Sequence, residues 1–304
     1  MPEDKPQIGV KRHRELKRYQ ALSLSSKVRY ARRLITRGLE QATRPAVAWS
    51  GGKDSTCLLH LVLEQEPDID VMYNDTGVEF PETRAFVEEI ASAWQINLHV
   101  AKPPPGTFWW CVEKYGFPLL GKRTRSWQEI KEIPGIRTSN KCCYYCKEKP
   151  SRLTCRELGI DLLFLGIMAA EGMVRKWGWY ERGDFYHVAK EGTWKVHPLS
   201  IWTDEDVWEY TRQAELPVWP LYSQGHRRNG CWPCCMDMAF DDNHLQALHR
   251  THPKLWRYLI VDRGLGEMLV QIKLGLNQGQ LDLFASTLGV EAMAEMRPCF
   301  FDKL

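Results

Sequence analysis

The sequence predicts an α/β fold, in which a helical arm precedes a doubly wound, mostly parallel β-sheet and a helical extension follows it. From Pro45 onward, short β-rich runs alternate with amphipathic helical stretches, which is the pattern of a parallel sheet covered by helices. The first of these runs ends in a glycine-rich turn that leads directly into a helical stretch. We therefore divide the chain into an arm at 1–44, a central domain at 45–235 and an extension at 236–304.

The predicted strands are short runs rich in residues that favour β-structure. They lie at 45–49, 69–74, 96–101 and 161–166. A helix is expected at 55–65, and a second one begins at Pro81, because proline is favoured in a first helical turn. The apolar residues that fall on one face of this second helix are Phe86, Val87, Ile90, Ala91 and Trp94.

Less regular segments surround the fourth strand. The stretch at 103–127 is irregular, aromatic and basic, and we interpret it as a long loop or an inserted subdomain near a ligand. Thr203 is expected to cap a later helix, because carboxylates follow it in the first turn, where they suit the helix dipole. These carboxylates belong to Asp204, Glu205 and Asp206. From Asp241 to the end the pattern is mainly helical.

The composition is that of an ordinary globular protein. Of the 304 residues, 44% are hydrophobic and 26% are charged, which disfavours disordered, collagenous and membrane-spanning classes. The longest apolar stretch, at 162–170, is too short to cross a bilayer. The first residues lack the apolar core of a signal peptide, so we expect a cytoplasmic protein without a membrane partner.

The N-terminal arm is basic. Residues 1–50 contain twelve Lys or Arg and four Asp or Glu, a charge excess that would suit contact with nucleic acid. The alternative is a solvated amphipathic helix, because apolar residues recur among the charges at near-helical spacing. They are Leu22, Val28, Leu34 and Leu39. On general grounds we favour the amphipathic helix.

The turn after the first strand has the composition of a phosphate site. It reads Ser50-Gly51-Gly52-Lys53-Asp54-Ser55. Two glycines allow close approach of the backbone to an anion, the helix N-terminus attracts negative charge, and Lys53 adds a positive charge. The turn lacks the GxxxxGK[ST] pattern of a Walker A loop. Taken alone, it could also be an ordinary strand-to-helix turn.

Four ordered motifs between residues 45 and 235 resemble a known family. The turn SGGKDS resembles the pyrophosphate loop of the adenine-nucleotide α-hydrolase superfamily, whose members split ATP between its α and β phosphates or hold a related adenylyl nucleotide. The other three resemble motifs of phosphoadenylyl-sulfate reductases: DTGxxFPET, PLxxWTxxDVW and IPxxPLYxxGxxxxGC. They begin here at Asp75, Pro198 and Leu216.

The resemblance implies an adenine-nucleotide site at the carboxyl ends of the strands. The loop amides, Ser50, Gly51, Gly52, Lys53 and Ser55 would hold the phosphates of ATP, with Lys53, Asp54 and Ser55 taking part in catalysis and Asp54 positioning Mg²⁺. Asp75, Thr76 and Gly77 would border the adenosine. Glu171 and Arg175 either face the nucleotide together or form a structural i,i+4 ion pair.

Six of the ten cysteines form two groups that call for metal or redox chemistry in a cytosolic protein. Cys142-Cys143 with Cys231 and Cys234 resembles the ligand set of a [4Fe–4S] cluster in adenylyl-sulfate reductases. Zinc is the alternative, held by Cys143, Cys146, Cys231 and Cys234. Cys146 and Cys235 are thus alternate ligands. The solitary Cys57, Cys111 and Cys155 are interpreted as core residues.

The reductases' C-terminal ECGxH motif is missing, and the last cysteine, Cys299, has apolar neighbours and is interpreted as a packed residue. The combination of a nucleotide site and cysteines without that motif resembles the ATP-pyrophosphatase component of DNA phosphorothioation systems. That resemblance implies ATP, DNA, a cysteine desulfurase and other phosphorothioation proteins as partners, and it is compatible with a homo-oligomer. The alternatives are a reductase that produces sulfite and a non-catalytic sensor of nucleotide and cluster.

Overall fold

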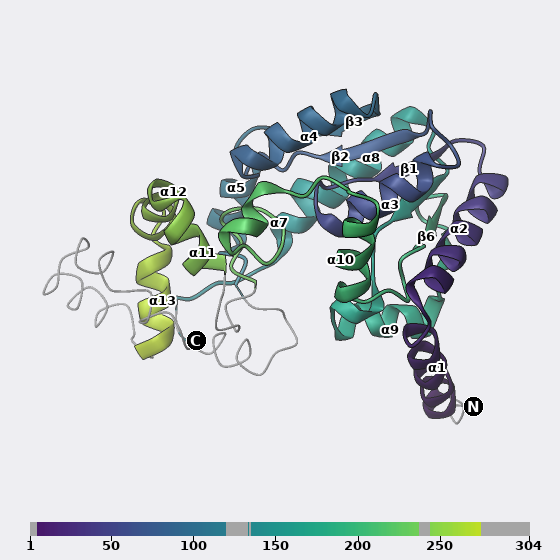
Figure 1. The fold of residues 1–304 in the computed structure, drawn as a ribbon. Coiled ribbons are helices and arrows are strands. Elements are labelled where there is room, and N and C mark those ends of the chain that lie inside the picture. Colours follow the sequence, from purple (N-terminus) through teal and green to yellow (C-terminus); the bar gives the residue numbers. More distant parts are fainter. Residues whose placement is uncertain (1–4, 120–132, 134, 237–243, 275–304) are drawn as a thin grey trace, which may run out of the picture. The chain divides into compact units, whose positions relative to one another are not determined.

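The computed structural model describes residues 5–119, 133, 135–236 and 244–274 (Figure 1). The chain forms two compact units that interleave along the sequence. The first consists of Met1–Asn74, Glu82–Ala101 and Ser151–Trp219, and the second of Asp75–Pro81, Lys102–Pro150 and Pro220–Leu304. The sequence-based boundaries after residues 44 and 235 remain predictions. Cys299, Asp241 and residues 120–127 of the irregular stretch lie outside the described residues.

The first unit contains the β-sheet. Its strands are β1 (Pro45–Ala48), β2 (Asp70–Asn74), β3 (Asn97–Ala101), β4 (Leu162–Leu165), β5 (Phe185–Val188) and β6 (Thr193–Val196). They lie in the order β3-β2-β1-β4-β6-β5, and every pairing is parallel except that of β5 with β6. The predicted mostly parallel sheet is therefore confirmed, and each of the four predicted strands is present.

The β5–β6 hairpin was not predicted from the sequence. Both strands have only four residues, and β5 lies at the edge of the sheet, where its side chains are half-buried or exposed. A strand in that position does not need the continuous apolar run that marks a strand buried on both faces. The sequence signal used for the other strands is therefore missing here.

Helices account for most of the remaining described residues. In the first unit they are α1 (Lys5–Gln20), α2 (Leu24–Gln41), α3 (Lys53–Leu63), α4 (Pro81–Ala93, whose first residue belongs to the second unit), α8 (Lys149–Leu158, which begins in the second unit), η2 (Ala169–Glu171), α9 (Met173–Arg182) and α10 (Asp204–Gln213). In the second unit they are α5 (Thr107–Tyr115), α7 (Lys141–Cys143), η1 (Tyr144–Glu148), η3 (Pro220–Gln224), α11 (His244–Thr251), α12 (Pro253–Arg257), η4 (Tyr258–Asp262) and α13 (Leu265–Leu274).

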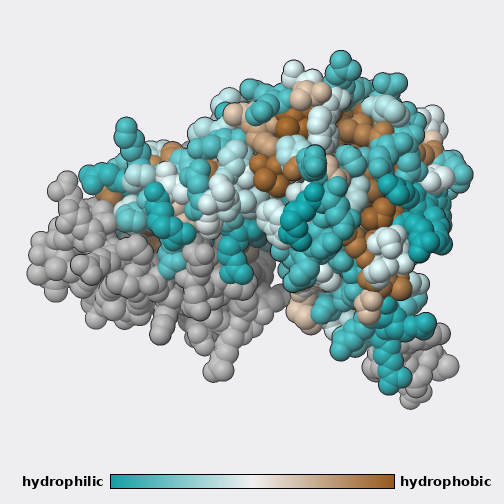
Figure 2. Space-filling model, viewed as in Figure 1, coloured by the Kyte–Doolittle hydropathy of each residue, from teal (hydrophilic) through white to brown (hydrophobic). Residues whose placement is uncertain are grey.

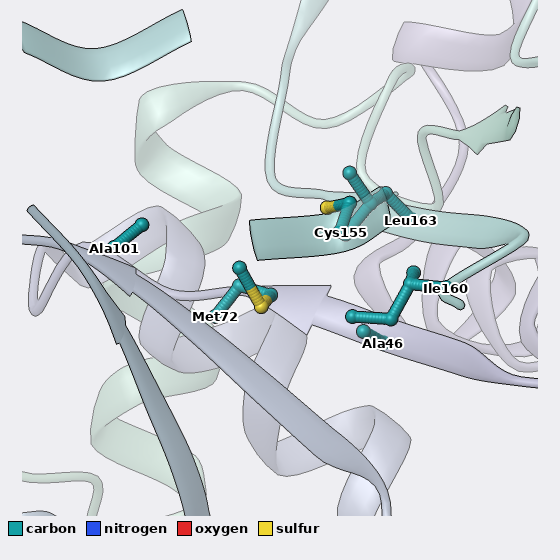
Figure 3. Close-up of a cluster of buried hydrophobic side chains, with 6 residues drawn as sticks. All are labelled: Ala46, Met72, Ala101, Cys155, Ile160 and Leu163. Carbon is teal, nitrogen blue, oxygen red and sulfur yellow. The ribbon is translucent and has the colours of Figure 1, made fainter. Parts of the chain in front are cut away.

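Helices cover both faces of the sheet, as the doubly wound prediction requires. On one face a buried cluster joins β-strand residues to α8 (Figure 3). Its members are Ala46, Met72, Ala101, Cys155, Ile160 and Leu163. On the other face α2 approaches so closely that a Cβ on Gly38 would lie 2.6 Å from the ring of Phe164. Residues 163 and 164 of β4 therefore point to opposite layers.

The N-terminal arm is helical, as expected, and α2 is amphipathic. Its apolar face buries Ala31, Leu34 and Ile35. Lys27 is also buried, and its Nζ lies 2.6 Å from Asp206 Oδ2 at the start of α10. Hydrophilic residues predominate on the described surface that Figure 2 shows. The described helices include none with the length and hydropathy that crossing a bilayer requires.

Candidate functional site

The turn between β1 and α3 is held in a fixed conformation by its two serines. The Ser55 hydroxyl accepts a hydrogen bond from the amide of Ser50 (3.1 Å), and it lies 3.0 Å from the Ser50 hydroxyl. Gly51 has a φ of 73°, a left-handed conformation that glycine adopts without steric cost. Residues 50–55 thus form a tight loop at the carboxyl end of β1, where the sequence predicted it.

The amides at the start of α3 are the anion-binding groups of this loop. Gly52 precedes the helix and has no side chain that could accept a hydrogen bond from its first turn. The first amides of a helix have no intrahelical partner and carry the positive end of its dipole. A phosphate group is therefore a chemically suitable ligand at this position.

Lys53 adds a buried positive charge to the loop. Its side chain is 8% exposed, and its Nζ lies 2.8 Å from Asp54 Oδ1 and 2.6 Å from Asp204 Oδ1. Burial lowers the pKa of Lys53, but the carboxylates of Asp54 and Asp204 outweigh that effect and raise it above its ordinary value. Lys53 is therefore a cation at neutral pH.

Asp204 is a residue of this site whose role sequence reasoning missed. The prediction that Thr203 caps α10 is confirmed, because its hydroxyl accepts from the amide of Asp206 and Asp206 accepts from the amide of Thr203 (2.7 Å). Asp204 was assigned only to the helix dipole. Its contact with Lys53 joins residues about 150 positions apart in the sequence, and a local sequence pattern cannot predict such a contact.

Gly166 marks a close approach between the end of β4 and this loop. A Cβ at Gly166 would lie 3.2 Å from the carbonyl oxygen of Asp54 and from the amide nitrogen of Ser55. Both of these atoms belong to the backbone, so they can yield only if α3 shifts. The site therefore depends on glycine at a position that sequence reasoning did not select.

We predict that Gly166→Ala lowers the free energy of unfolding by about 1–3 kcal/mol, because the added methyl overpacks this contact. Urea unfolding would measure the change. Gly172→Ala is the matched control, since a Cβ there would meet no atom within 4 Å. An unchanged stability of Gly166→Ala would contradict the close packing of β4 against the loop.

Glu171 and Arg175 form an ion pair with each other at the start of α9. Glu171 Oε2 also accepts a hydrogen bond from the amide of Met168 (2.8 Å). The structural i,i+4 pair is therefore present, and a role of the two residues toward a nucleotide remains a prediction.

His197 follows β6 directly and is buried without a partner for its Nε2 among the described residues. The hydroxyl of Ser200, three residues later, is likewise buried without a partner in the described part of the chain. Burial, together with the charges of Arg182, Arg175 and Lys195, lowers the pKa of His197 to about 4. The imidazole is therefore neutral at physiological pH.

This shift predicts a pH-dependent stability. The unfolded chain takes up a proton on His197 below pH 6.5, the ordinary value, whereas the folded chain does so only near pH 4, so stability falls as the pH drops between the two. We expect a loss of about 2 kcal/mol from about pH 7 to about pH 5. The His197→Gln variant should lose correspondingly less in urea titrations at both pH values. Equal losses in the two proteins would contradict a buried, neutral His197.

Asp75, Thr76 and Gly77 form a turn in the second unit. The carboxylate of Asp75 accepts from the amide of Gly77 (3.0 Å), and its other oxygen lies 3.2 Å from Lys102 Nζ. The Thr76 hydroxyl donates to Glu79 Oε1 (2.7 Å). These three residues thus share one turn, whereas the loop at 50–55 belongs to the first unit.

The same turn lies beside the second cysteine group. Thr76 Oγ1 is 3.4 Å from the sulfur of Cys231, and the amide of Trp232 donates to the carbonyl of Val78 (3.0 Å). Glu79 and Cys231 also form an antiparallel β-bridge. A segment predicted to border the nucleotide and a segment predicted to bind metal are therefore joined within the second unit.

Residues of the two cysteine groups influence each other electrostatically although they are far apart in the sequence, and their joint binding of a metal remains a prediction. Cys142 and Cys143 share a hydrogen bond that lowers the pKa of Cys143 to about 6, and Cys142 also interacts electrostatically with Cys234 and Cys231. Lys147 is placed among these thiols. Its pKa is raised chiefly by Cys231, with contributions from Glu79, Cys143 and Cys234.

The alternate cysteines occupy different surroundings. Cys146 is buried and shares a hydrogen bond with Cys111. The solitary Cys111, which is buried as predicted, therefore adjoins the first group. Cys235 is buried, and its amide donates to the carbonyl of Pro118 (3.0 Å). Both alternates are thus more enclosed than Cys143, which is exposed.

All nine cysteines within the described ranges are free thiols. Their number and softness suit iron–sulfur or zinc. However, the described part of the chain contains no group of three or more His, Cys, Asp or Glu side chains arranged to hold a metal ion. The donor chemistry therefore fits a metal centre, while the present side-chain positions do not form a coordination site.

Comparisons with known proteins agree with the sequence motifs. Residues 44–237 match the family model of the phosphoadenosine phosphosulfate reductase domain. A phosphoadenosine 5'-phosphosulfate reductase of Xylella fastidiosa (strain M23) is 30% identical over 182 residues, which are 60% of this chain and 68% of the relative. The corresponding reductase of Xanthomonas campestris pv. campestris (strain B100) is 31% identical over 194 residues, 63% of this chain and 70% of the relative.

A solved structure was also found to be similar. It is the phosphoadenylyl-sulfate reductase from Candida auris in its phosphate complex, with 18% identity and a TM-score of 0.49. The match covers 76% of this chain and 97% of that one.

Proposed function

The chain belongs to the phosphoadenosine phosphosulfate reductase domain family, and from that premise we propose that it is an ATP pyrophosphatase that activates an acceptor for sulfur insertion. The observation that carries this proposal is the loop at residues 50–55, where the amides of a helix N-terminus and the buried Lys53 meet. The proposed reaction converts ATP to AMP and pyrophosphate.

In the proposed reaction an acceptor oxygen attacks the α-phosphorus of ATP and forms a new P–O bond. The bond from that phosphorus to the α,β-bridging oxygen breaks, and its electron pair leaves with pyrophosphate. With water as the acceptor the products are AMP, pyrophosphate and a proton. With a phosphate oxygen of another molecule as the acceptor, the adenylyl group stays on that oxygen, and AMP leaves with it when a sulfur nucleophile attacks the acceptor's phosphorus. The leaving group is the part of the molecule on which negative charge accumulates, so stabilisation is needed there.

The residues of the loop would supply that stabilisation. The amides of Gly51 to Ser55 and the hydroxyls of Ser50 and Ser55 would donate hydrogen bonds to pyrophosphate oxygens. Lys53 would exchange its contact with Asp204 for a contact with phosphate, because both are anionic partners. Asp54 would then be available to position Mg²⁺, an ion that prefers oxygen ligands.

The adenosine and the nucleotide's other groups would be held by other segments. Asp75, Thr76 and Gly77 would border the adenosine. Glu171 and Arg175 would face the nucleotide, with Arg175 exchanging some of its hydrogen bonds to Glu171 for contacts with the ligand. These assignments rest on the resemblance of the motifs.

We further propose that Cys142, Cys143, Cys231 and Cys234 hold a [4Fe–4S] cluster, which would supply redox and sulfur chemistry when bound. Support comes from the electrostatic influence of Cys143, Cys231 and Cys234 on Cys142, and from Lys147, whose charge would offset that of a thiolate-bound cluster. Side-chain rotation would be needed for ligation, since no coordination site is formed among the described residues.

The acceptor proposed here is the DNA backbone, with a cysteine desulfurase and other phosphorothioation proteins as partners. A reductase is the second candidate, because the similar curated relatives carry that name. The sequence lacks ECGxH, the motif whose cysteine attacks sulfur in those reductases, which favours the hydrolytic reaction.

Incubation of the full chain with ATP and, separately, with adenylyl sulfate plus a thiol donor distinguishes the candidate functions. AMP and pyrophosphate from ATP are the expected products. Sulfite from adenylyl sulfate would instead establish a reductase. Binding of either nucleotide without turnover would establish a sensor and overturn the proposed activity.

A further inference from the structure

Four aromatic side chains of the second unit form one continuous group, which we term the aromatic platform. It consists of Trp110, Tyr115, Tyr144 and Tyr145, from α5 and η1. The rings of Tyr115 and Tyr145 are stacked, with centroids 6.0 Å apart and an interplanar angle of 12°. Trp110 meets Tyr145 edge-on at 5.1 Å, and Tyr144 meets Tyr145 edge-on at the same distance.

The platform is exposed to solvent rather than buried as a small core. Trp110 is 42% exposed and Tyr144 is 38% exposed. The opposite side of α5 is packed, because Phe108 and Cys111 are both buried. Large aromatic faces left in water are a feature of binding surfaces more than of packing.

A cation lies against the same rings. Lys114 Nζ is 4.9 Å from the centroid of Trp110 and 5.5 Å from that of Tyr115. Lys141, on the helical turn that precedes Tyr144, is also exposed. Aromatic faces combined with Lys or Arg suit single-stranded nucleic acid, because bases stack on the rings and phosphates pair with the cations.

The platform is built on the segments that carry the first cysteine group. Tyr144 and Tyr145 separate Cys143 from Cys146 in the chain, and Cys111, which follows Trp110, hydrogen-bonds with Cys146. A ligand that stacks on these rings would therefore be held next to the thiols to which the proposed function assigns the cluster.

We propose that the aromatic platform binds an unpaired nucleobase of the acceptor strand and thereby holds its backbone near the cysteine groups. The inference rests on the proposed function for the identity of the strand as DNA, but base stacking itself requires neither ATP nor its turnover. It also assigns a ligand to part of the aromatic and basic stretch at 103–127, which the nucleotide site leaves unused.

The test is binding of a fluorescently labelled single-stranded oligodeoxynucleotide to the full chain, followed by anisotropy without ATP. The Trp110→Ala and Tyr144→Ala variants should each bind about tenfold more weakly than the unchanged protein. Trp110→Phe should retain most of the affinity, since it keeps an aromatic face. Trp177→Ala is the matched control, because Trp177 is 50% exposed on α9 in the first unit.

Lys114→Gln should reduce the salt dependence of binding by about one phosphate contact. Equal affinity of Trp110→Ala, Tyr144→Ala and the unchanged protein would overturn the proposal, as would an equal loss in Trp177→Ala. Circular dichroism of each variant identifies one that has failed to fold, and the other Ala variant then decides the outcome.

The two proposals fail in different ways. No production of AMP with intact, platform-dependent DNA binding would refute the ATP pyrophosphatase and leave the platform standing. An RNA strand of the same sequence that binds more tightly through the same residues would support the platform and refute DNA as the acceptor. Production of AMP with no binding of either strand would overturn the platform alone.

Discussion

The Lys53→Ala variant is expected to form AMP and pyrophosphate about 100- to 1000-fold more slowly than the unchanged protein, the loss typical of a removed charge-stabilising donor. Lys53 is a buried cation at the start of α3, directly in the loop that would hold the leaving group. Its removal takes away positive charge where negative charge develops. Initial rates of pyrophosphate release at saturating ATP would measure the effect on the chemical step.

Two further variants separate this role from a structural one. Lys190→Ala removes an exposed lysine from the β5–β6 turn of the same unit and should leave the rate unchanged. Asp204→Asn keeps Lys53 but removes one of its carboxylate partners, so the protein should remain active. If Lys53→Ala, shown to be folded, turns over ATP at the normal rate, Lys53 has no part in the reaction.

The Cys231→Ser variant, purified anaerobically, is expected to lose nearly all of its bound iron and acid-labile sulfide. Cys231 is a member of the proposed ligand set and interacts electrostatically with Lys147, Cys234 and Cys142. A serine oxygen is a poor substitute for a soft thiolate ligand of iron. Iron and sulfide analysis, together with the absorption spectrum, would measure the loss.

The other cysteines serve as controls and decide between ligand sets. Cys57→Ser should keep the cluster, because Cys57 is buried in the first unit, where its thiol lies 3.3 Å from the hydroxyl of Thr211. Cys146→Ser should also keep the cluster if Cys142 is the fourth ligand. The variant should lose the metal centre if Cys146 takes the place of Cys142 in the ligand set. Zinc in place of iron in the unchanged protein would refute the cluster.

The loop and the helix after it could be predicted from the sequence because both depend on neighbouring residues. Two glycines before Lys53 and an apolar run after it fix a strand–turn–helix element within about twenty positions. The cap at Thr203 is equally local and was predicted with its acidic first turn. The meeting of the two cysteine groups was predicted only from the family resemblance, since their spacing of almost ninety residues carries no geometric information.

Other features depend on contacts that no local pattern encodes. Asp204 forms its ion pair with Lys53 only because the fold brings α10 next to the loop after β1. Gly166 lies against the start of α3 only because the fold pairs β4 with β1. The aromatic platform similarly combines rings from α5 and η1. Two of them, Tyr144 and Tyr145, lie between Cys143 and Cys146 in the sequence, where the cysteines were the more informative residues.

The most direct test of the central claim is a crystal structure with an ATP analogue whose α,β-bridging oxygen is replaced by methylene, which prevents cleavage. We predict that its β- and γ-phosphates lie on the amides of Gly51 to Ser55, with Lys53 Nζ moved from Asp204 to a phosphate oxygen. An analogue that binds elsewhere and leaves these amides without a phosphate would contradict the assignment of this loop as the pyrophosphate site.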